Sequence, residues 1–357
     1  MNERINRIRN IMSEKSLDGL IVTGRANTFY LSGFTGSTSY LLIGREKAWI
    51  VVDFRYTIQA GEQVFEGIEV VEHTESFLTT LNRIIADEGM DSIGFEGNNL
   101  SYSEYERFKT KLLHARRLES LGDAIDLLRI RKDEVEIEAI AQAVKLGDQV
   151  FDQVLKVIRP GIKEMELAAE IEYQMRKLGA SGPSFATIVA SGERSAMCHG
   201  AASERKIKPG DALIMDFGVI YRNYCSDMTR TIFVGDPGEE MKKIYRIVSE
   251  AQLAALECLH SGMKARDADR VARDIITLEG YGDNFGHSLG HGVGIEIHEE
   301  PRLSVKSEDT LLDGMVFSVE PGIYVEGLGG VRIEDMVVLE DGKPRNLTGS
   351  TKEMIVL

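Results

Sequence analysis

The sequence predicts a fold of two domains, an α/β domain at the N-terminal end followed by an α+β domain. Three observations lead to this expectation. The chain has 357 residues, and at about 150 residues per domain this length suggests two domains with separate cores. Short β-rich runs alternate with helical patterns up to about residue 128. From about residue 184 onward, strand-like runs joined by glycine-containing turns dominate.

The N-terminal domain is expected to span residues 1–128. Ile5, Ile8 and Ile11 recur at helical spacing, which predicts an amphipathic helix that docks on the body of the domain. The expected strands are Gly19–Thr23, Tyr40–Ile43, Ala48–Val52 and Ser92–Phe95, and the expected helices are Glu75–Glu88 and Ser103–Leu113. This alternation indicates one sheet covered by helices.

The C-terminal domain is expected to span residues 129–357. A charged stretch without proline or glycine, 128–140, leads directly into a helix that begins near Lys132. The expected helices are Asp133–Val157, Lys163–Leu178, Glu239–His260 and Lys264–Leu278. The expected strands are Phe185–Ala190, Ala212–Phe217, Thr229–Val234, Met315–Val319, Gly322–Val325 and Val331–Leu339. Short turns between these strands predict a mostly antiparallel sheet.

Charge and composition exclude several classes of partner. The formal net charge of -15 repels phosphate, so we expect neither nucleic acid nor an anionic membrane as a partner. No apolar run approaches the roughly 18 residues of a membrane span, and the charged N-terminus has no signal-peptide core. Three cysteines, none in a C-x-x-C pair, are typical of a reducing cytoplasm.

Two aspartates interrupt neighbouring strand runs in the segment 211–235. Asp216 lies within an apolar run, and Asp227 precedes the next one. A hairpin whose turn is centred between Tyr221 and Arg222 places these carboxylates directly opposite each other, with Cβ atoms about 5 Å apart. Two such like charges destabilise a sheet, and a bound cation reverses the sign of that effect.

A second pair of carboxylates occupies the segment 317–338. Glu320 and Glu334 flank the glycine-rich turn Gly327–Gly330, so a hairpin brings them close together. Each stands in an otherwise apolar strand, where an unpaired buried carboxylate costs several kcal/mol. Any one such residue taken alone is more often a satisfied polar group, but two symmetric pairs indicate a shared function.

Three of the seven histidines lie in the segment 284–301: His287, His291 and His298. Glycines between them allow the backbone to approach a ligand closely. A neutral imidazole is a common metal ligand and also a general acid or base. A fourth histidine, His199, lies in the small-residue segment SAMCHGAAS.

The run Gly286–Gly290 also matches the G-x-S-x-G pattern of a serine hydrolase. That mechanism requires an acid and then a histidine later in the chain. No histidine follows His298, which comes too soon after Ser288 for an acid-bearing strand to lie between them. We therefore interpret the match as chance.

These segments resemble the pita-bread metallopeptidases, which include methionine aminopeptidase, aminopeptidase P and prolidase and share their fold with the metal-free creatinases. The matching segments, in the order and spacing of the family, are IMDFG with Asp216, CSDMTRT with Asp227, GHGVG with His291, SVEPG with Glu320 and VRIED with Glu334. The resemblance implies a pita-bread catalytic domain that binds two divalent cations. Asp216 is then expected to bind one cation, Asp227 and Glu334 to bridge both, and His291 and Glu320 to complete the other. Such ligands suit Mn²⁺ or Co²⁺ at least as well as Zn²⁺.

The resemblance also implies roles in catalysis. Glu320 is expected to act as a general acid or base in addition to binding metal. His287 and His298 are expected to donate hydrogen bonds to the scissile carbonyl or the tetrahedral oxygen. His199 is expected to contact substrate near the scissile nitrogen, and Arg332 to meet a substrate carboxylate.

The N-terminal segments LDGLIVTGRANTFYLSGFTGS (17–37) and VVDFRY (51–56) resemble the creatinase-type N-terminal domain. Methionine aminopeptidases lack that domain, so the resemblance implies an enzyme that removes the N-terminal residue from Xaa-Pro peptides or dipeptides. The family resemblance also implies a homodimer, and the cysteine usage predicts a cytoplasmic protein. Two alternatives remain open on the same fold: a methionine-type or broader aminopeptidase, and a non-catalytic binding protein. The sequence does not separate a dipeptidase from an aminopeptidase.

Overall fold

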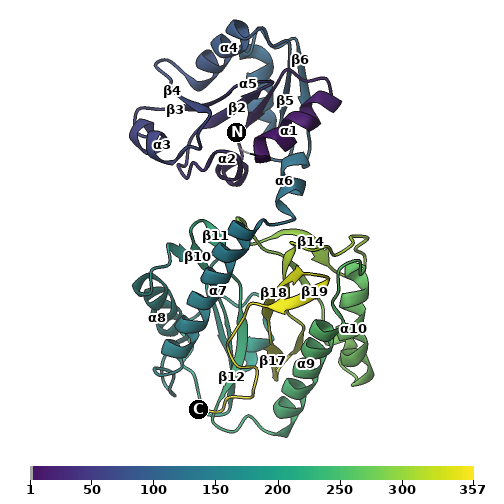
Figure 1. Ribbon diagram of the computed structural model, residues 1–357. Helices are drawn as coiled ribbons and strands as arrows, with labels where there is room; N and C mark the ends of the chain where they lie inside the picture. The colour runs from purple at the N-terminus through teal and green to yellow at the C-terminus, as the bar shows by residue number, and fades with distance from the viewer. Residues whose placement is uncertain (1–2) are drawn as a thin grey trace. The chain divides into compact units, whose positions relative to one another are not determined.

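The computed structural model describes residues 3–357, which form two compact units (Figure 1). The first unit extends to Arg129, and the second runs from Ile130 to Leu357. Each unit has its own core.

The first unit contains a six-stranded sheet in the order β4-β3-β2-β1-β5-β6. Its strands are β1 (Gly19–Val22), β2 (Tyr40–Gly44), β3 (Ala48–Val52), β4 (Ile68–Glu72), β5 (Ser92–Phe95) and β6 (Arg117–Ser120). The β1–β2 and β2–β3 pairs are antiparallel, and the other pairs are parallel. The four expected strands are confirmed, whereas the two edge strands β4 and β6 were not expected.

The helices of the first unit are α1 (Glu3–Glu14), α2 (Arg25–Ser32), α3 (Thr57–Gln63), α4 (Phe77–Asp87), α5 (Tyr102–Lys111) and α6 (Ala124–Arg129). The amphipathic N-terminal helix is confirmed, because Ile5, Ile8 and Met12 are buried on one face of α1. The hydroxyl of Ser76 accepts a hydrogen bond from the backbone N–H of Thr79 and so begins α4.

The second unit places two helices on each side of its strands (Figure 1). They are α7 (Glu134–Val154), α8 (Glu164–Lys177), α9 (Glu239–Cys258) and α10 (Ala265–Leu278), and all four were expected. A reciprocal capping box between Asp133 and Glu136 begins α7. One core lies between α7, α8 and the strands near Met215, and the other between α9, α10 and the strands near Phe317.

The named strand pairs of the second unit are all antiparallel, which confirms the expected character of its sheets. The strands are β7 (Gly182–Pro183), β8 (Ile188–Ser191), β9 (Asp211–Asp216), β10 (Val219–Tyr221), β11 (Tyr224–Cys225), β12 (Thr229–Val234), β13 (Gly290–Gly292), β14 (Glu299–Leu303), β15 (Val316–Val319), β16 (Gly322–Val325), β17 (Gly329–Arg332), β18 (Asp335–Glu340) and β19 (Lys343–Asn346). Two short 3-10 helices, η1 (Gly192–Ala196) and η2 (Gly282–Asn284), complete the unit.

Several details of the second unit differ from expectation, and the short strands β7, β10, β11 and β19 were among those not expected. The run Val331–Leu339, expected as one strand, is divided between β17 and β18 at Ile333 and Glu334. The histidine segment contains two strands that were not expected, β13 and β14.

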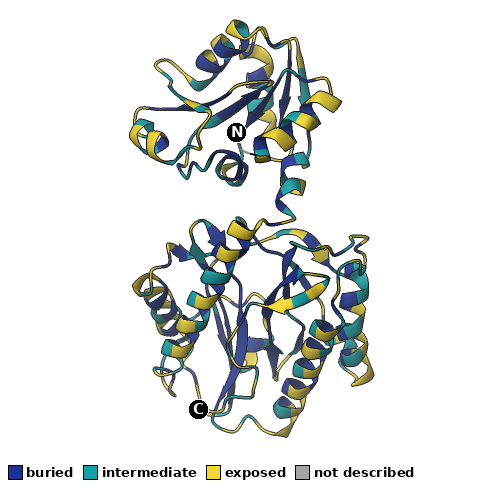
Figure 2. Cartoon of the chain, viewed as in Figure 1, coloured by how far each residue is buried: buried dark blue, intermediate teal, exposed yellow. Residues whose placement is uncertain are grey.

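Burial follows these layers. The central strands are buried, and the helices turn an exposed face outward (Figure 2). In residues 3–357, no helix combines the length and the apolar character that crossing a membrane requires.

Candidate metal centre

The first ligand-bearing hairpin joins β9 to β12 through β10 and β11. Its turn is Arg222–Asn223, because Tyr221 pairs with Tyr224. Both turn residues have positive φ, 48° and 66°, as a two-residue hairpin turn of type I′ requires.

The turn therefore lies one residue beyond the expected position, and the predicted direct pairing of the two aspartates is wrong. Asp216 instead faces Thr229. A one-residue movement of the turn centre shifts the pairing by two residues, so the face that each side chain occupies is retained. Asp216 and Asp227 thus become diagonal neighbours on one face, which remain within reach of each other.

The second hairpin has the expected register. Val319 pairs with Asp335, and Gly322 pairs with Arg332. Glu320 and Glu334 therefore stand opposite each other in the gap between these two ladders. There the backbone N–H of Glu334 leaves the ladder and donates to the carbonyl of Thr229, 3.1 Å away. This bond joins the two hairpins at the site.

His291 reaches the carboxylates from β13, where glycines allow a close approach of backbones. A Cβ atom on Gly290 would lie 1.9 Å from the carbonyl oxygen of Ser318, and one on Gly292 would lie 2.3 Å from that of Glu300. Any side chain at either position would therefore displace the strand that carries His291.

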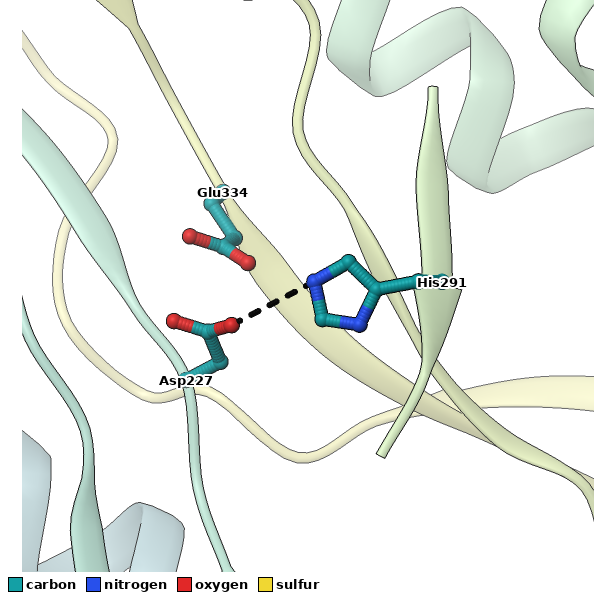
Figure 3. A group of neighbouring side chains, drawn as sticks. All are labelled: Asp227, His291 and Glu334. Carbon is teal, nitrogen blue, oxygen red and sulfur yellow. Dashed lines mark ion pairs between the residues drawn. The ribbon is translucent and has the colours of Figure 1, made fainter. Parts of the chain in front are cut away.

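Asp227, His291 and Glu334 converge at one point (Figure 3). One potential ligand atom from each lies within 4.8 Å of the others. The Nε2 atom of His291 is 3.6 Å from Asp227 Oδ2 and 3.4 Å from Glu320 Oε1. Its Nδ1 atom lies 3.0 Å from the carbonyl of Gly292, which fixes the hydrogen on Nδ1. The lone pair of Nε2 therefore faces the carboxylates.

The electrostatics of this cluster favour a bound cation. Burial raises the pKa of both Asp227 and Glu334 well above their usual values, and neighbouring carboxylates raise each pKa further. Burial also raises the pKa of Glu320 to about 7, although the charge of Arg332 opposes the shift. Burial lowers the pKa of His291, so its imidazole is neutral and suited to metal binding.

Two carboxylate oxygens in the cluster have no hydrogen-bond partner. They are Oδ1 of Asp216 and Oε1 of Glu334, and both are buried. The other oxygen of each side chain is held, because Arg332 Nη2 contacts Asp216 Oδ2 and the Thr229 hydroxyl donates to Glu334 Oε2 at 2.7 Å. A buried oxygen without a partner is costly, and hard divalent cations prefer such oxygen ligands. The five residues expected as ligands therefore fit a metal site.

Arg332 is buried, and its guanidinium donates to four oxygen acceptors within the protein. Besides its contact with Asp216, Nε donates to the hydroxyl of Thr229 at 2.9 Å, and Nη1 donates to the hydroxyl of Tyr324 at 2.7 Å. Nη1 also donates to the carbonyl of Cys198 at 3.1 Å. The guanidinium thus supports the carboxylate cluster and presents no open fork to a substrate carboxylate.

His287 is engaged in the same network. Its Nδ1 atom lies 2.7 Å from the carbonyl of Ser288, and its Nε2 atom lies 3.0 Å from the hydroxyl of Tyr324. The carbonyl requires the hydrogen on Nδ1, so Nε2 accepts from Tyr324. Burial lowers the pKa of His287 to about 4, which keeps the ring neutral. In this arrangement His287 orients Tyr324 and has no donor left for an oxyanion.

His298 and His199 lie beside the cluster. The ring of His298 packs edge-on against that of His291, with 4.4 Å between ring centroids. His199 is exposed, and burial lowers the pKa of His298. Of the four histidines, these two are the exposed ones.

Two contributors were missed in the sequence, Thr229 and Tyr324. Thr229 lies two residues after Asp227, and strand alternation could have placed it on the same face. Tyr324 lies two residues after Gly322 on β16, but no feature of the sequence indicates that its hydroxyl connects Arg332 to His287.

Both units match known family models. Residues 4–131 match the creatinase/prolidase N-terminal domain, and residues 138–341 match metallopeptidase family M24.

Relatives match over nearly the full length. The Xaa-Pro dipeptidase of Pyrococcus furiosus is 40% identical over 357 residues, covering 99% of this chain and 100% of that one. The solved Xaa-Pro dipeptidase from Bacillus anthracis is 42% identical, with a TM-score of 0.96 and 99% of each chain covered. The X-Pro aminopeptidase from Thermotoga maritima is 40% identical, with a TM-score of 0.91, covering 97% of this chain and 99% of that one.

Proposed function

Since the chain belongs to metallopeptidase family M24, we propose that it uses two divalent cations to hydrolyse the bond between an N-terminal residue and a following proline. The observation that carries this proposal is the buried cluster of carboxylates, in which oxygens of Asp216 and Glu334 have no partner in the protein. The names of the relatives support the choice of Xaa-Pro substrates.

The proposed ligands divide between two cations. Asp216, Asp227, His291, Glu320 and Glu334 would hold them, with Asp216 serving one cation, His291 and Glu320 the other, and Asp227 and Glu334 shared between them. When bound, the cations lower the pKa of a shared water and stabilise negative charge that develops on the substrate. Oxygen-rich ligation with one imidazole favours Mn²⁺ or Co²⁺, with Zn²⁺ also compatible.

The remaining residues act on the substrate and on proton transfer. Glu320 is held by the hydroxyl of Ser318, 3.1 Å from its Oε1, and is proposed to accept and return a proton. His298 is proposed to donate to the substrate oxygen, and the exposed His199 to contact the substrate near the scissile nitrogen. Arg332 and His287, whose donors are used internally, are proposed to position Asp216 and Tyr324.

Xaa-Pro bonds suit a site of this kind for a chemical reason. Proline has no amide N–H, so the enzyme need not provide an acceptor at that position. We expect kcat/KM for Xaa-Pro substrates to exceed that for Xaa-Ala by at least about 10-fold, or about 1.4 kcal/mol of transition-state binding.

The test compares three substrates on protein reconstituted with Mn²⁺ or Co²⁺: an Xaa-Pro dipeptide, an Xaa-Pro-Yaa tripeptide and a Met-Ala-Ser peptide. Cleavage of either Xaa-Pro substrate in preference to Met-Ala-Ser supports the proposal. Preference for Met-Ala-Ser indicates a methionine-type enzyme, and no cleavage together with no tightly held metal indicates a binding protein on the same fold.

A second candidate activity is removal of Xaa from longer Xaa-Pro chains. The similarity to the X-Pro aminopeptidase from Thermotoga maritima favours it. The same assay decides, because a dipeptidase leaves the tripeptide largely uncut.

We also propose that the protein works in the cytoplasm as a homodimer. Cys198, Cys225 and Cys258 are free thiols, as a reducing compartment favours. Phe54 and Ile58 are 76% and 80% exposed in the N-terminal unit, and they offer apolar surface to a second copy. Light scattering after size-exclusion chromatography measures the mass, and a monomer at micromolar concentration rules the dimer out.

A further inference from the structure

A buried ion pair lies directly behind Glu334. Arg230 Nη2 contacts Asp335 Oδ1 at 2.7 Å, and the two side chains are 1% and 0% exposed. Arg230 is on β12, close to Asp227, whereas Asp335 begins β18 immediately after Glu334. The pair therefore connects the two hairpins on which the proposed ligands lie.

The guanidinium of Arg230 uses every donor it has. Nη1 contacts the carbonyl of Glu334 and lies 3.0 Å from that of Thr229. Nε donates to the carbonyl of Thr351 at 2.9 Å, and Nη2 donates to that of Ser350 at 2.7 Å in addition to Asp335. These are five N–H groups with five acceptors, the full capacity of an arginine.

The second carboxylate oxygen of Asp335 also accepts several hydrogen bonds. Its Oδ2 accepts from Lys352 at 2.5 Å, from Asn346 at 2.8 Å and from Gln252 of α9 at 3.0 Å. The pair thereby fixes the segment around Ser350–Lys352 and α9 to the start of β18, directly after Glu334.

Stability alone does not explain so many contacts. Well-packed apolar residues of similar volume are often as stable as a buried ion pair, because desolvation offsets the Coulombic attraction. An ion pair differs from such packing in fixing geometry, and here the fixed group is the backbone of Glu334. The Thr229 carbonyl and hydroxyl already hold the backbone N–H and Oε2 of Glu334, and Arg230 holds its carbonyl. Its Oε1 remains open toward the site.

We infer that Arg230 and Asp335 are positioning residues that hold Glu334 in the orientation required to bind metal. The inference rests on the proposed metal site. It concerns only how this chain orients one ligand, and no substrate contact is assigned to either residue.

The test measures Co²⁺ binding by calorimetry and by the visible absorption spectrum of the bound ion. Arg230→Lys keeps a positive charge beside Asp335, but a single ammonium cannot reach the carbonyls of Glu334 and Thr351 together. We expect its affinity for Co²⁺ to fall about 10- to 100-fold, with an altered spectrum. Wild-type affinity and spectrum in folded Arg230→Lys protein would overturn the inference.

A matched control lies on the same hairpin. Arg205 pairs with Asp211 through two contacts, of 2.5 and 2.9 Å, at the end of β9 away from Asp216. Arg205→Lys changes a similar pair away from the ligands and should leave Co²⁺ affinity unchanged. An equal loss in this variant would contradict a specific role for Arg230.

Two further variants keep the result interpretable. If Arg230→Lys does not fold, Lys352→Met removes one donor from Asp335 at a partly exposed position, where weakened Co²⁺ binding supports the inference and unchanged binding refutes it. Glu334→Gln tests the metal site itself. Wild-type Co²⁺ binding by Glu334→Gln means that the ligand assignment is wrong. Loss in Glu334→Gln but not in Arg230→Lys means that only the positioning role is wrong.

Discussion

Replacing Arg332 with methionine should show how much stability its positive charge gives to the buried carboxylates. Arg332 is 3% exposed and its guanidinium contacts Asp216, so Arg332→Met leaves a buried carboxylate without its positive partner. Thr229 and Tyr324 also lose a donor. Removing one partner of a buried ion pair costs about 3–5 kcal/mol.

The expected fall in Tm depends on whether metal is bound. At roughly 2–4 °C per kcal/mol for a domain of this size, the Tm of the metal-free variant should fall by roughly 6–20 °C. Excess Mn²⁺ should restore part of that loss, because a cation bound to Asp216 replaces the missing charge. Differential scanning calorimetry with and without a chelator measures both values. A metal-free Tm within about 2 °C of wild type, less than 1 kcal/mol, would refute this account of Arg332.

The same variant decides whether Arg332 meets the substrate. Because its donors are used internally, kcat/KM should fall equally for an Xaa-Pro dipeptide and an Xaa-Pro-Yaa tripeptide. A loss confined to the dipeptide would show instead that the guanidinium binds the substrate carboxylate, as the family resemblance implies.

Three further predictions concern metal, catalysis and pH. Chelation should abolish peptidase activity and Mn²⁺ or Co²⁺ should restore it, whereas full activity in a metal-free sample would contradict the proposed function. His298→Ala should keep its metal and lose roughly 10²–10³-fold in kcat, whereas His291→Ala should lose metal. Metal analysis of the two purified variants tests this. Loss of metal from His298→Ala, with metal retained by His291→Ala, would exchange the roles of the two histidines. Burial raises the pKa of Glu164, but hydrogen bonds from Ser203 and Ser191 outweigh it and hold the pKa below the usual 4.5. The stability that Glu164 contributes is therefore fully present above the usual pKa of 4.5 and is lost as pH falls through the lowered pKa, so Glu164→Gln should flatten the decline in urea-unfolding free energy below about pH 4.5; an unchanged slope would exclude this contribution.

The helices and central strands could be predicted because local patterns determine them. The helix expected over Asp133–Val157 is α7, and its start is visible in the sequence as the capping residues Asp133 and Glu136. Edge strands such as β4 were not foreseen, because half-buried edges have a weaker apolar pattern.

The register of the two hairpins shows where sequence reasoning succeeds and where it does not. The turn between β16 and β17 contains Gly327 at positive φ, an ordinary glycine signal. The turn Arg222–Asn223 has no glycine, and an arginine at positive φ is uncommon, so its position could not be read with confidence from the residues. The misplaced turn gave Asp216 the wrong cross-strand partner but the correct face of the sheet.

The roles of Arg332 and His287 could not be determined from the sequence for a different reason. Arg332 lies in a run that was expected as a strand, and His287 lies in the histidine segment, but their hydrogen bonds are made to Asp216, Tyr324, Thr229 and the carbonyls of Cys198 and Ser288. Which acceptors surround a buried donor depends on contacts between distant segments. Local pattern contains no information about these contacts.

The bond between Thr229 and Glu334 spans 105 residues, and the contact between Asp216 and Arg332 spans 116. Contacts of such long range form late in folding, because each must close a long loop before it gains any stabilising energy. A refolding chain should therefore regain helical circular dichroism before it regains high affinity for metal. Time-resolved uptake of Co²⁺ would then report the completion of the catalytic unit, and early intermediates would remain without tightly bound metal even when the ion is abundant.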